Sequence, residues 1–109
     1  MLVKNLDKVE EKSVTHNPEL KKREMLVNGE VPHLAMFSQV CFKSGQKVSN
    51  HKHKDMHEIF FVESGSGVLR SKKNAVALFP GKCVAVKPEE DHEIEALGDL
   101  VLIYFGIIE

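Results

Sequence analysis

The chain has little of what marks the specialised protein classes. It has no tryptophan and only two cysteines, and its net charge at neutral pH is −1. Such a charge gives no electrostatic reason to expect a nucleic acid or an anionic membrane as a partner. No apolar run approaches the roughly 18 residues that a membrane-spanning helix needs, and the charged N-terminus lacks the apolar core of a signal peptide. We therefore expect a cytoplasmic protein with neither kind of partner.

The two cysteines do not form a known metal-binding or redox motif. Cys41 and Cys83 each stand alone in an apolar segment, and the C-x-x-C pattern is absent. We therefore expect both to be buried free thiols in a reducing compartment.

Turn signals recur at short intervals and predict an all-β fold. Asn28-Gly29 is typical of a type I′ hairpin, Ser64–Gly67 and Leu97–Asp99 predict breaks between strands, and Pro80-Gly81 fits a type II turn. The absence of long helical patterns argues against βαβ units, and many short strands favour a sandwich or barrel. The predicted strands are Leu34–Lys43, Glu58–Glu63, Val68–Ser71, Ala75–Phe79, Lys82–Lys87, His92–Ala96 and Leu100–Ile108.

The N-terminal third is less regular than the rest of the chain. Residues 1–17 are expected to form an arm around a barrel or a loosely ordered end. The segment Leu20–Val27 fits either a short helix or a strand, and the strand is favoured. With 109 residues the chain suits one domain. We expect residues 1–33 to form the arm and the first strand or strands, and residues 34–109 to form the barrel.

Some polar residues carry no functional pattern. The basic run Lys21-Lys22-Arg23 is too short to indicate more than a solvated patch. His16 and His33 are expected to be ordinary surface residues. By contrast, Leu100–Ile108 is apolar on both faces, which predicts a central strand covered on both sides or a strand buried by a partner subunit.

Potential metal ligands are concentrated between Gly45 and Gly65. Because side chains alternate along a strand, His51 and His53 are expected to point to the same side of one strand segment. Glu58 follows a polar connector and begins an apolar strand. If Glu58 points inward, Phe60 and Val62 also point inward, whereas Ile59 and Phe61 face outward.

These residues and the downstream His92 form a donor set of three imidazoles and one carboxylate. Buried in an apolar barrel, such groups are costly unless they are paired or bound to a metal. The set favours Fe(II), Mn(II), Co(II), Ni(II) or Zn(II), with two positions open in octahedral geometry. A closed structural zinc site is disfavoured because no cysteine joins the set. We expect one divalent transition metal, held by His51, His53, Glu58 and His92.

Simpler interpretations exist for each histidine. His51 and His53 could belong to a solvated polar loop, and His92 alone could be a surface residue in a proline-containing turn. His57 is an alternative to its neighbour Glu58 as a metal ligand, because the two point to opposite faces of a strand and only one of them can point into the site. We expect His57 to be solvated, although it could also line the mouth of the site or orient a ligand through a hydrogen bond.

The spacing of these residues resembles the cupin superfamily. The first cupin motif, G-x5-H-x-H-x3,4-E-x6-G, is matched at every fixed position by Gly45, His51, His53, Glu58 and Gly65. A chance match at all five has a probability on the order of 10⁻⁶ per start position, given the composition of the chain.

The second cupin motif, G-x5-P-x-G-x2-H-x3-N, is matched less well. Gly81 and His92 are correctly spaced, but Lys87, Glu89 and Ala96 replace the proline, the glycine and the asparagine. The turn before His92 is therefore expected to take a different path.

The resemblance covers about Leu34 to Phe105 and implies a small jelly-roll or double-stranded β-helix barrel. It also implies His51, His53, Glu58 and His92 as metal ligands. Cupins of this size are commonly homodimers, and they include dioxygenases, isomerases, epimerases, decarboxylases and non-catalytic binding domains. The motif therefore specifies the site better than the reaction.

Two functions follow as expectations. The first is a metal-dependent enzyme of oxygenase or isomerase type that acts on a small oxygen-bearing molecule. Its metal would be a Lewis acid, and Glu58 could double as a general base. The second is a non-catalytic module that binds or senses a small ligand and carries a structural metal. In both cases we expect a small-molecule partner and a homodimer.

Overall fold

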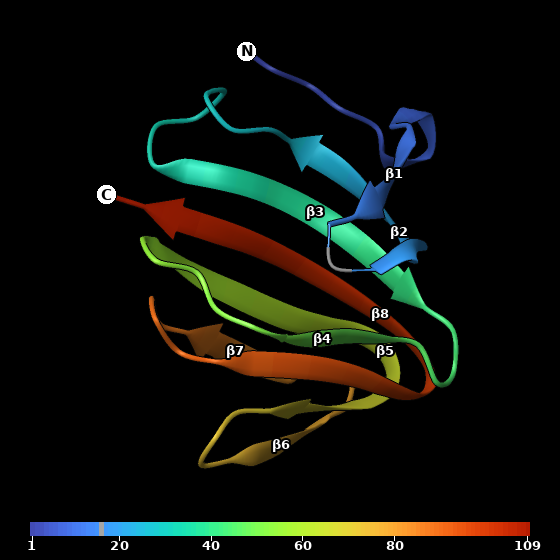
Figure 1. Ribbon diagram of the computed structural model, residues 1–109. Coiled ribbons are helices and arrows are strands. Elements are labelled where there is room, and N and C mark those ends of the chain that lie inside the picture. The colour runs from blue at the N-terminus through green and yellow to red at the C-terminus, as the bar shows by residue number, and fades with distance from the viewer. Residues whose placement is uncertain (16) are drawn as a thin grey trace.

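The computed structural model describes residues 1–15 and 17–109 and confirms the all-β prediction (Figure 1). The prediction for His16 lies outside these residues. No helix in the described ranges is long and apolar enough to cross a membrane. The elements are a short 3-10 helix, η1 (Leu6–Lys8), and the strands β1 (Glu11–Val14), β2 (Asn17–Leu26), β3 (Leu34–Phe42), β4 (Lys47–His51), β5 (Met56–Arg70), β6 (Ala75–Leu78), β7 (Cys83–Val86) and β8 (His92–Ile108).

Antiparallel pairing joins these strands into one curved sheet. The order is β1-β2-β3-β8-β5-β6, while β4 pairs with β8 and β7 pairs with β5. The two longest strands, β5 and β8, pair with each other along most of their length. The first part of β8 also pairs with β4 and its second part with β3. The sheet therefore folds over on itself and encloses an interior (Figure 1).

Two breaks predicted from turn residues are wrong. Ser64–Gly67 lies inside β5, and Leu97–Asp99 lies inside β8. The β5–β8 ladder has register shifts between Val62 and Ser64 and between Gly65 and Gly67. The turn-type residues therefore produce bulges that bend a continuous pair of strands, and they do not end either strand.

The N-terminal third extends the sheet at one edge. The strand interpretation of Leu20–Val27 is confirmed by β2, which pairs with β1 and β3. The type I′ turn at Asn28-Gly29 is wrong, because such a turn needs a positive φ at Asn28 and only Gly29 of the two has one. The type II turn at Pro80-Gly81 is supported, since the Lys82 amide donates to the Phe79 carbonyl at 3.0 Å.

The hydrophobic core lies inside the curved sheet. Glu58 is buried together with Phe60 and Val62, whereas Phe61 is 43% exposed, so the predicted facing of β5 is confirmed. The largest fully buried apolar side chains come from four different strands and are Leu20, Val62, Leu78, Leu100 and Leu102.

The outer face of the sheet carries both cysteines. Cys41 and Cys83 are free but exposed, so the prediction of buried thiols is wrong. Cys41 lies between the buried residues Val40 and Phe42, and alternation along β3 therefore turns it outward. His33 is exposed, as predicted.

Candidate metal centre

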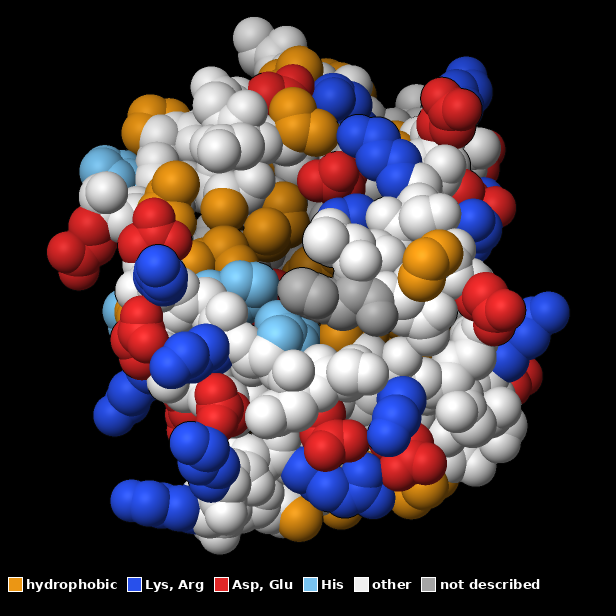
Figure 2. Space-filling model, in the orientation of Figure 1, with side chains coloured by type: hydrophobic (Ala, Val, Ile, Leu, Met, Phe, Trp, Pro, Cys, Tyr) orange, Lys and Arg blue, Asp and Glu red, His pale blue; other side chains and the backbone are white. Residues whose placement is uncertain are grey.

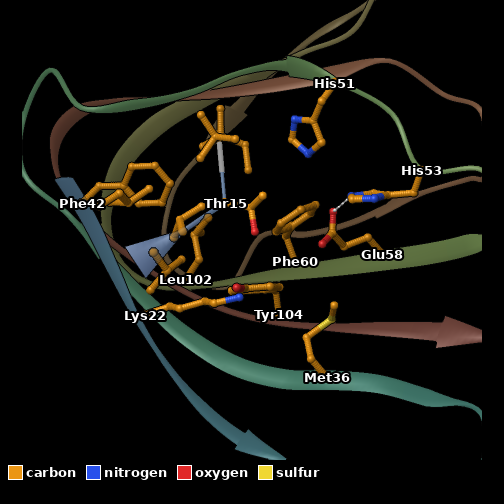
Figure 3. Close-up of a pocket in the computed structure, with 15 residues that line it drawn as sticks. Thr15, Lys22, Met36, Phe42, His51, His53, Glu58, Phe60, Leu102 and Tyr104 are labelled. Atoms are coloured by element: carbon orange, nitrogen blue, oxygen red, sulfur yellow. Dashed lines mark ion pairs between the residues drawn. The ribbon is translucent and has the colours of Figure 1, made fainter. Parts of the chain in front are cut away.

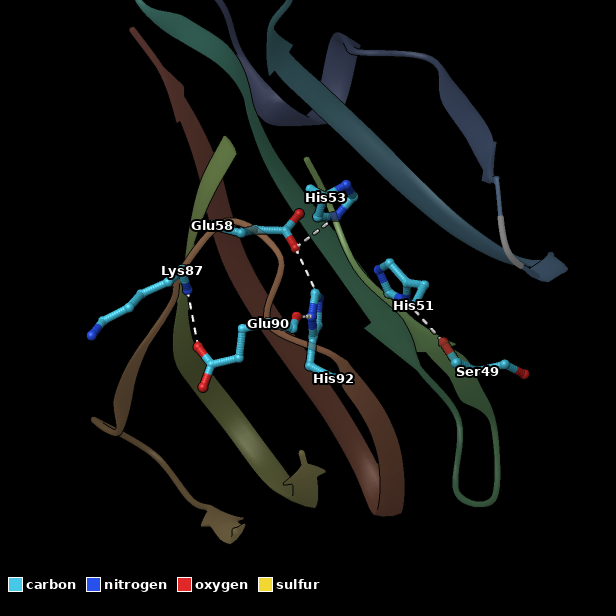
Figure 4. Close-up of polar contacts among 7 residues, drawn as sticks. All are labelled: Ser49, His51, His53, Glu58, Lys87, Glu90 and His92. Atoms are coloured by element: carbon cyan, nitrogen blue, oxygen red, sulfur yellow. Dashed lines mark hydrogen bonds and ion pairs between the residues drawn. The ribbon is translucent and has the colours of Figure 1, made fainter. Parts of the chain in front are cut away.

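The four residues predicted as ligands converge in the interior of the barrel. His51 ends β4, His53 follows two residues later, Glu58 is the third residue of β5, and His92 begins β8. One nitrogen or oxygen atom from each lies within 4.8 Å of the others, so the group could hold a metal ion. Figure 4 shows the three imidazoles and the carboxylate pointing toward one another.

Strand pairing and one loop contact bring the residues together. His51 lies opposite His92 in the β4–β8 ladder, and Glu58 lies between β7 and β8. His53 lies beyond the end of β4, so the prediction that one strand supplies both histidines is wrong in that detail. The His53 carbonyl accepts a hydrogen bond of 2.6 Å from the Glu89 amide, which ties its loop to the turn before β8.

The turn before His92 forms although this chain lacks the glycine that the second cupin motif has there. Glu89 stands at that position and has a φ of +66°, in the left-handed region that glycine adopts without strain. A side chain there costs about 1–2 kcal/mol. The turn is closed by a 3.2 Å bond from the Glu90 amide to the Lys87 carbonyl and a 3.0 Å bond from the Lys87 amide to the Glu90 carboxylate. The substitution of glycine therefore does not keep His92 out of the cluster.

Glu58 interacts electrostatically with two of the imidazoles. Glu58 is 6% exposed, and its Oε1 atom lies 3.3 Å from Nε2 of both His53 and His92. Burial raises the pKa of Glu58, but contact with the two imidazoles outweighs it and lowers the pKa to about 2. Burial lowers the pKa of His92, but Glu58 and the Glu90 carbonyl reverse the effect and raise that pKa above its usual value.

Backbone carbonyls fix the orientation of two imidazoles. The Nδ1 atom of His51 lies 2.8 Å from the Ser49 carbonyl oxygen, and that of His92 lies 3.1 Å from the Glu90 carbonyl oxygen. A carbonyl can only accept, so Nδ1 carries the proton on both rings and the lone pair of a neutral ring is on Nε2. This arrangement is common for histidines that bind metals through Nε2.

The remaining polar atoms fit a cation. With its proton on Nδ1, a neutral His92 directs the Nε2 lone pair at the Glu58 carboxylate, which is unfavourable unless a proton or a cation lies between them. The His53 Nε2 atom is buried and lies 3.3 Å from Glu58 Oε1, but it makes no hydrogen bond within the described part of the chain. A divalent ion among the four residues would satisfy these atoms together. Three nitrogens and one oxygen suit a transition metal.

A cavity of about 290 Å³ adjoins the cluster, and it is lined by His51, His53 and Glu58. Most of its wall is apolar, as Figure 2 shows from outside and Figure 3 shows in close-up. Tyr104 stacks on Phe60, with ring centroids 5.8 Å apart. Burial raises the pKa of the Tyr104 hydroxyl, which therefore stays protonated.

Comparison with known proteins identifies the family. A cupin domain matches residues 38–107, and this match includes all four residues of the cluster. The chain belongs to the cupin family. No match was found among curated proteins.

Solved cupin structures have the same fold. A predicted oxalate decarboxylase from Thermotoga maritima superimposes with a TM-score of 0.89 at 20% identity, over 99% of this chain and 100% of the other. Ectoine synthase from P. lautus superimposes with a TM-score of 0.85 at 17% identity, over 99% of this chain and 78% of the other. An RmlC-like cupin from Shewanella frigidimarina superimposes with a TM-score of 0.82 at 19% identity, over 97% of this chain and 89% of the other. At these identities the likeness shows the fold alone.

The cupin barrel also contains site residues that the sequence did not predict. Lys22 lines the cavity, so the interpretation of the whole basic run as a solvated patch is wrong for this residue. The signal was its position two residues after Leu20, which puts both on the same side of a strand. Tyr104 was hidden in an apolar strand. His57 is exposed and on the opposite face from Glu58, as predicted.

Proposed function

We propose that this cupin binds one divalent transition metal through His51, His53, Glu58 and His92 and uses it to act on a small oxygen-bearing molecule. The observation that carries the proposal is the convergence of three imidazoles and one carboxylate within 4.8 Å beside a cavity. The metal would be Fe, Mn, Ni, Co or Zn, and the chemistry would be of oxygenase or isomerase type.

A bound metal would supply a Lewis acid that polarises an oxygen atom of the ligand. The residues of the chain orient the ligand and exclude water. The stacked pair Phe60 and Tyr104 forms an apolar wall, and the protonated Tyr104 hydroxyl can donate a hydrogen bond. The low pKa of Glu58 favours a role as ligand over one as general base, because an efficient base has a pKa near the working pH.

A binding or sensing module is the second candidate, and one observation favours it. Glu58 is the only carboxylate among the described residues that line the cavity, and it belongs to the ligand set. Without a second carboxylate, acid–base chemistry would rest on Tyr104, Lys22 and the bound metal. A site of this kind can bind a ligand without turning it over.

The metal and its reactivity distinguish the two functions. Protein loaded with Fe(II) under nitrogen would be mixed with air-saturated buffer and a panel of small organic acids, and oxygen uptake would be measured. An isomerase arm would follow proton exchange from the same acids by NMR in deuterated buffer, with the Zn(II)-loaded protein. Oxygen uptake or exchange above that of His92→Ala supports an enzyme. Ligand binding with neither reaction would support the module.

We also propose that the chain forms a homodimer through the outer face of β3, β8 and β5. Phe61 and Ile107 are 43% and 40% exposed there, and Ile103 and Phe105 lie beside them on β8. Such a face favours association, and a net charge of −1 gives little repulsion between two copies. Sedimentation equilibrium should give twice the chain mass, and Phe61→Glu should give the monomer. A monomeric wild type would refute the proposal.

A cytoplasmic location is proposed on the state of the thiols. Cys41 and Cys83 are exposed and unpaired, and free exposed thiols persist in a reducing compartment. Thiol titration of protein alkylated at lysis should give two free thiols per chain. Quantitative oxidation would argue for another compartment.

A further inference from the structure

One cation lies in the cavity without a partner among the residues that the structure describes. Lys22 extends inward from β2 and is the only lysine or arginine among the described residues of the cavity lining. Its ammonium group makes no hydrogen bond or ion pair with any residue in the described ranges. Leu20 lies two residues before Lys22 on β2, and Val40 and Leu102 lie in the same cross-strand row. All three line the cavity, and none of them carries a polar side-chain group.

The inward position of the Lys22 charge is not explained by a contact that stabilises the fold. Lys12 lies directly opposite Lys22 in the β1–β2 ladder, and like charges in this position repel. Glu24, the nearest acidic residue on that side of β2, pairs with Lys12 at 3.3 Å. By contrast, Lys21 on the opposite face donates to Ser13 and to the Pro18 carbonyl. Within the described ranges the charge of Lys22 is therefore left for a group that the fold does not supply.

The position of Lys22 relative to the metal centre defines a two-ended site. Lys22 lies in one cross-strand row with Val40 and Leu102, whereas Glu58 lies two rows further along the barrel. Rows on one face are roughly 6.6 Å apart along the strands. Tyr104 and Phe60 form the row between them, and Figure 3 shows these two rings between the Lys22 ammonium and the Glu58 carboxylate.

We propose that Lys22 binds the far anionic group of a small organic acid whose other oxygen-bearing end meets the metal centre. The ligand class is an acid with an anionic group at each end and a short apolar spacer that packs on Phe60 and Tyr104. The cavity of about 290 Å³ equals roughly ten water volumes, which suits a molecule of this size. The inference rests on the proposed function only for the metal end.

Calorimetry with matched acids tests the two ends separately. Glutarate and adipate would be titrated into Zn(II)-loaded and metal-free protein, with pentanoate and hexanoate as monocarboxylates of equal length. The variants are Lys22→Met, which keeps the length and removes the charge, Lys22→Arg, which keeps the charge, and Lys21→Met as the control on the opposite face. Thermal melts verify that each variant is folded.

We expect a dicarboxylate to bind loaded wild type more tightly than its monocarboxylate. Lys22→Met should weaken that dicarboxylate by about ten- to a hundredfold, the loss expected for one hydrogen bond to a charged group, and leave the monocarboxylate unchanged. Lys22→Arg should retain most of the affinity, and Lys21→Met all of it. In metal-free protein, dicarboxylate binding should weaken but still depend on Lys22.

Other results would overturn the inference. These are equal binding of the two acid classes, no binding of either dicarboxylate, or an equal effect of Lys21→Met and Lys22→Met. Failure of the protein to take up zinc would refute the proposed function instead. In that case the dependence on Lys22 in metal-free protein still decides whether the anion site exists.

Discussion

The two glycines that bracket the first motif should differ sharply in their tolerance of a side chain. Gly45 and Gly65 both have a φ near +90°, so alanine at either position incurs about 1–2 kcal/mol of backbone strain. Their surroundings differ. A Cβ at Gly45 would meet nothing within 4 Å, whereas one at Gly65 would overlap the main-chain carbonyl of Asp99 and lie 2.7 Å from Cα of Leu100.

The expected cost follows from these two contributions. Overlap with a packed neighbour adds about 1–3 kcal/mol, and the neighbour here is the backbone of β8, which cannot rotate away. We therefore expect Gly45→Ala to lower the free energy of unfolding by about 1–2 kcal/mol and Gly65→Ala by about 2–5 kcal/mol. A difference of about 2 kcal/mol corresponds to roughly 8–16 °C in Tm for a domain of this size.

Urea denaturation followed by far-UV circular dichroism measures both costs. The chain has no tryptophan and one tyrosine, so the β-sheet signal is the better probe. Asparagine separates strain from overlap, because it tolerates a positive φ but keeps the Cβ. Gly45→Asn should be close to wild type and Gly65→Asn should remain destabilised. Equal costs for the two alanine variants would refute the argument that Gly65 is needed for the close approach of β5 and β8.

Two further predictions concern the metal and the turn before it. Metal binding requires deprotonated ligands. The pKa of Glu58 is about 2, so this carboxylate stays ionised, whereas the pKa of His92 is raised. Affinity should therefore begin to fall while the pH is still above the ordinary histidine value of about 6.5, and it should continue to fall below that value. A chelator competition from pH 8 to 5 measures this, and constant affinity would contradict it. Glu89→Gly should raise the free energy of unfolding by up to about 1 kcal/mol. It removes about 1–2 kcal/mol of strain at φ +66°, and the larger entropy that glycine loses on folding offsets about 0.5–1 kcal/mol of that gain. Urea melts measure the change, and clear destabilisation would count against it.

The cluster could be predicted from the sequence because most of its information is local. His51, His53 and Glu58 lie within eight positions of one another. Their spacing also predicts that their side chains point to the same side of the sheet. His92 was assigned through its spacing from Gly81, which matches the second motif of the cupin superfamily that the chain resembles. The structure brings all four together, although it places His53 in a loop.

The errors concern features that depend on distant parts of the chain. Ser64–Gly67 contains turn residues, yet pairing with β8 carries the strand through them as bulges. The exposure of Cys41 depends on whether another layer covers its face. Lys22 became a cavity residue because β2 closes the barrel beside β3, and no local pattern shows which strand lies beside which.

Metal content is the most direct test of the central claim. Protein purified without added metal or chelator, and then offered Fe(II), Mn(II), Co(II), Ni(II) or Zn(II), would be examined by elemental analysis. The account predicts about one tightly held divalent ion per chain, lost in His51→Ala and kept in His57→Ala. No uptake of any of these metals, or greater loss in His57→Ala than in His51→Ala, would contradict it.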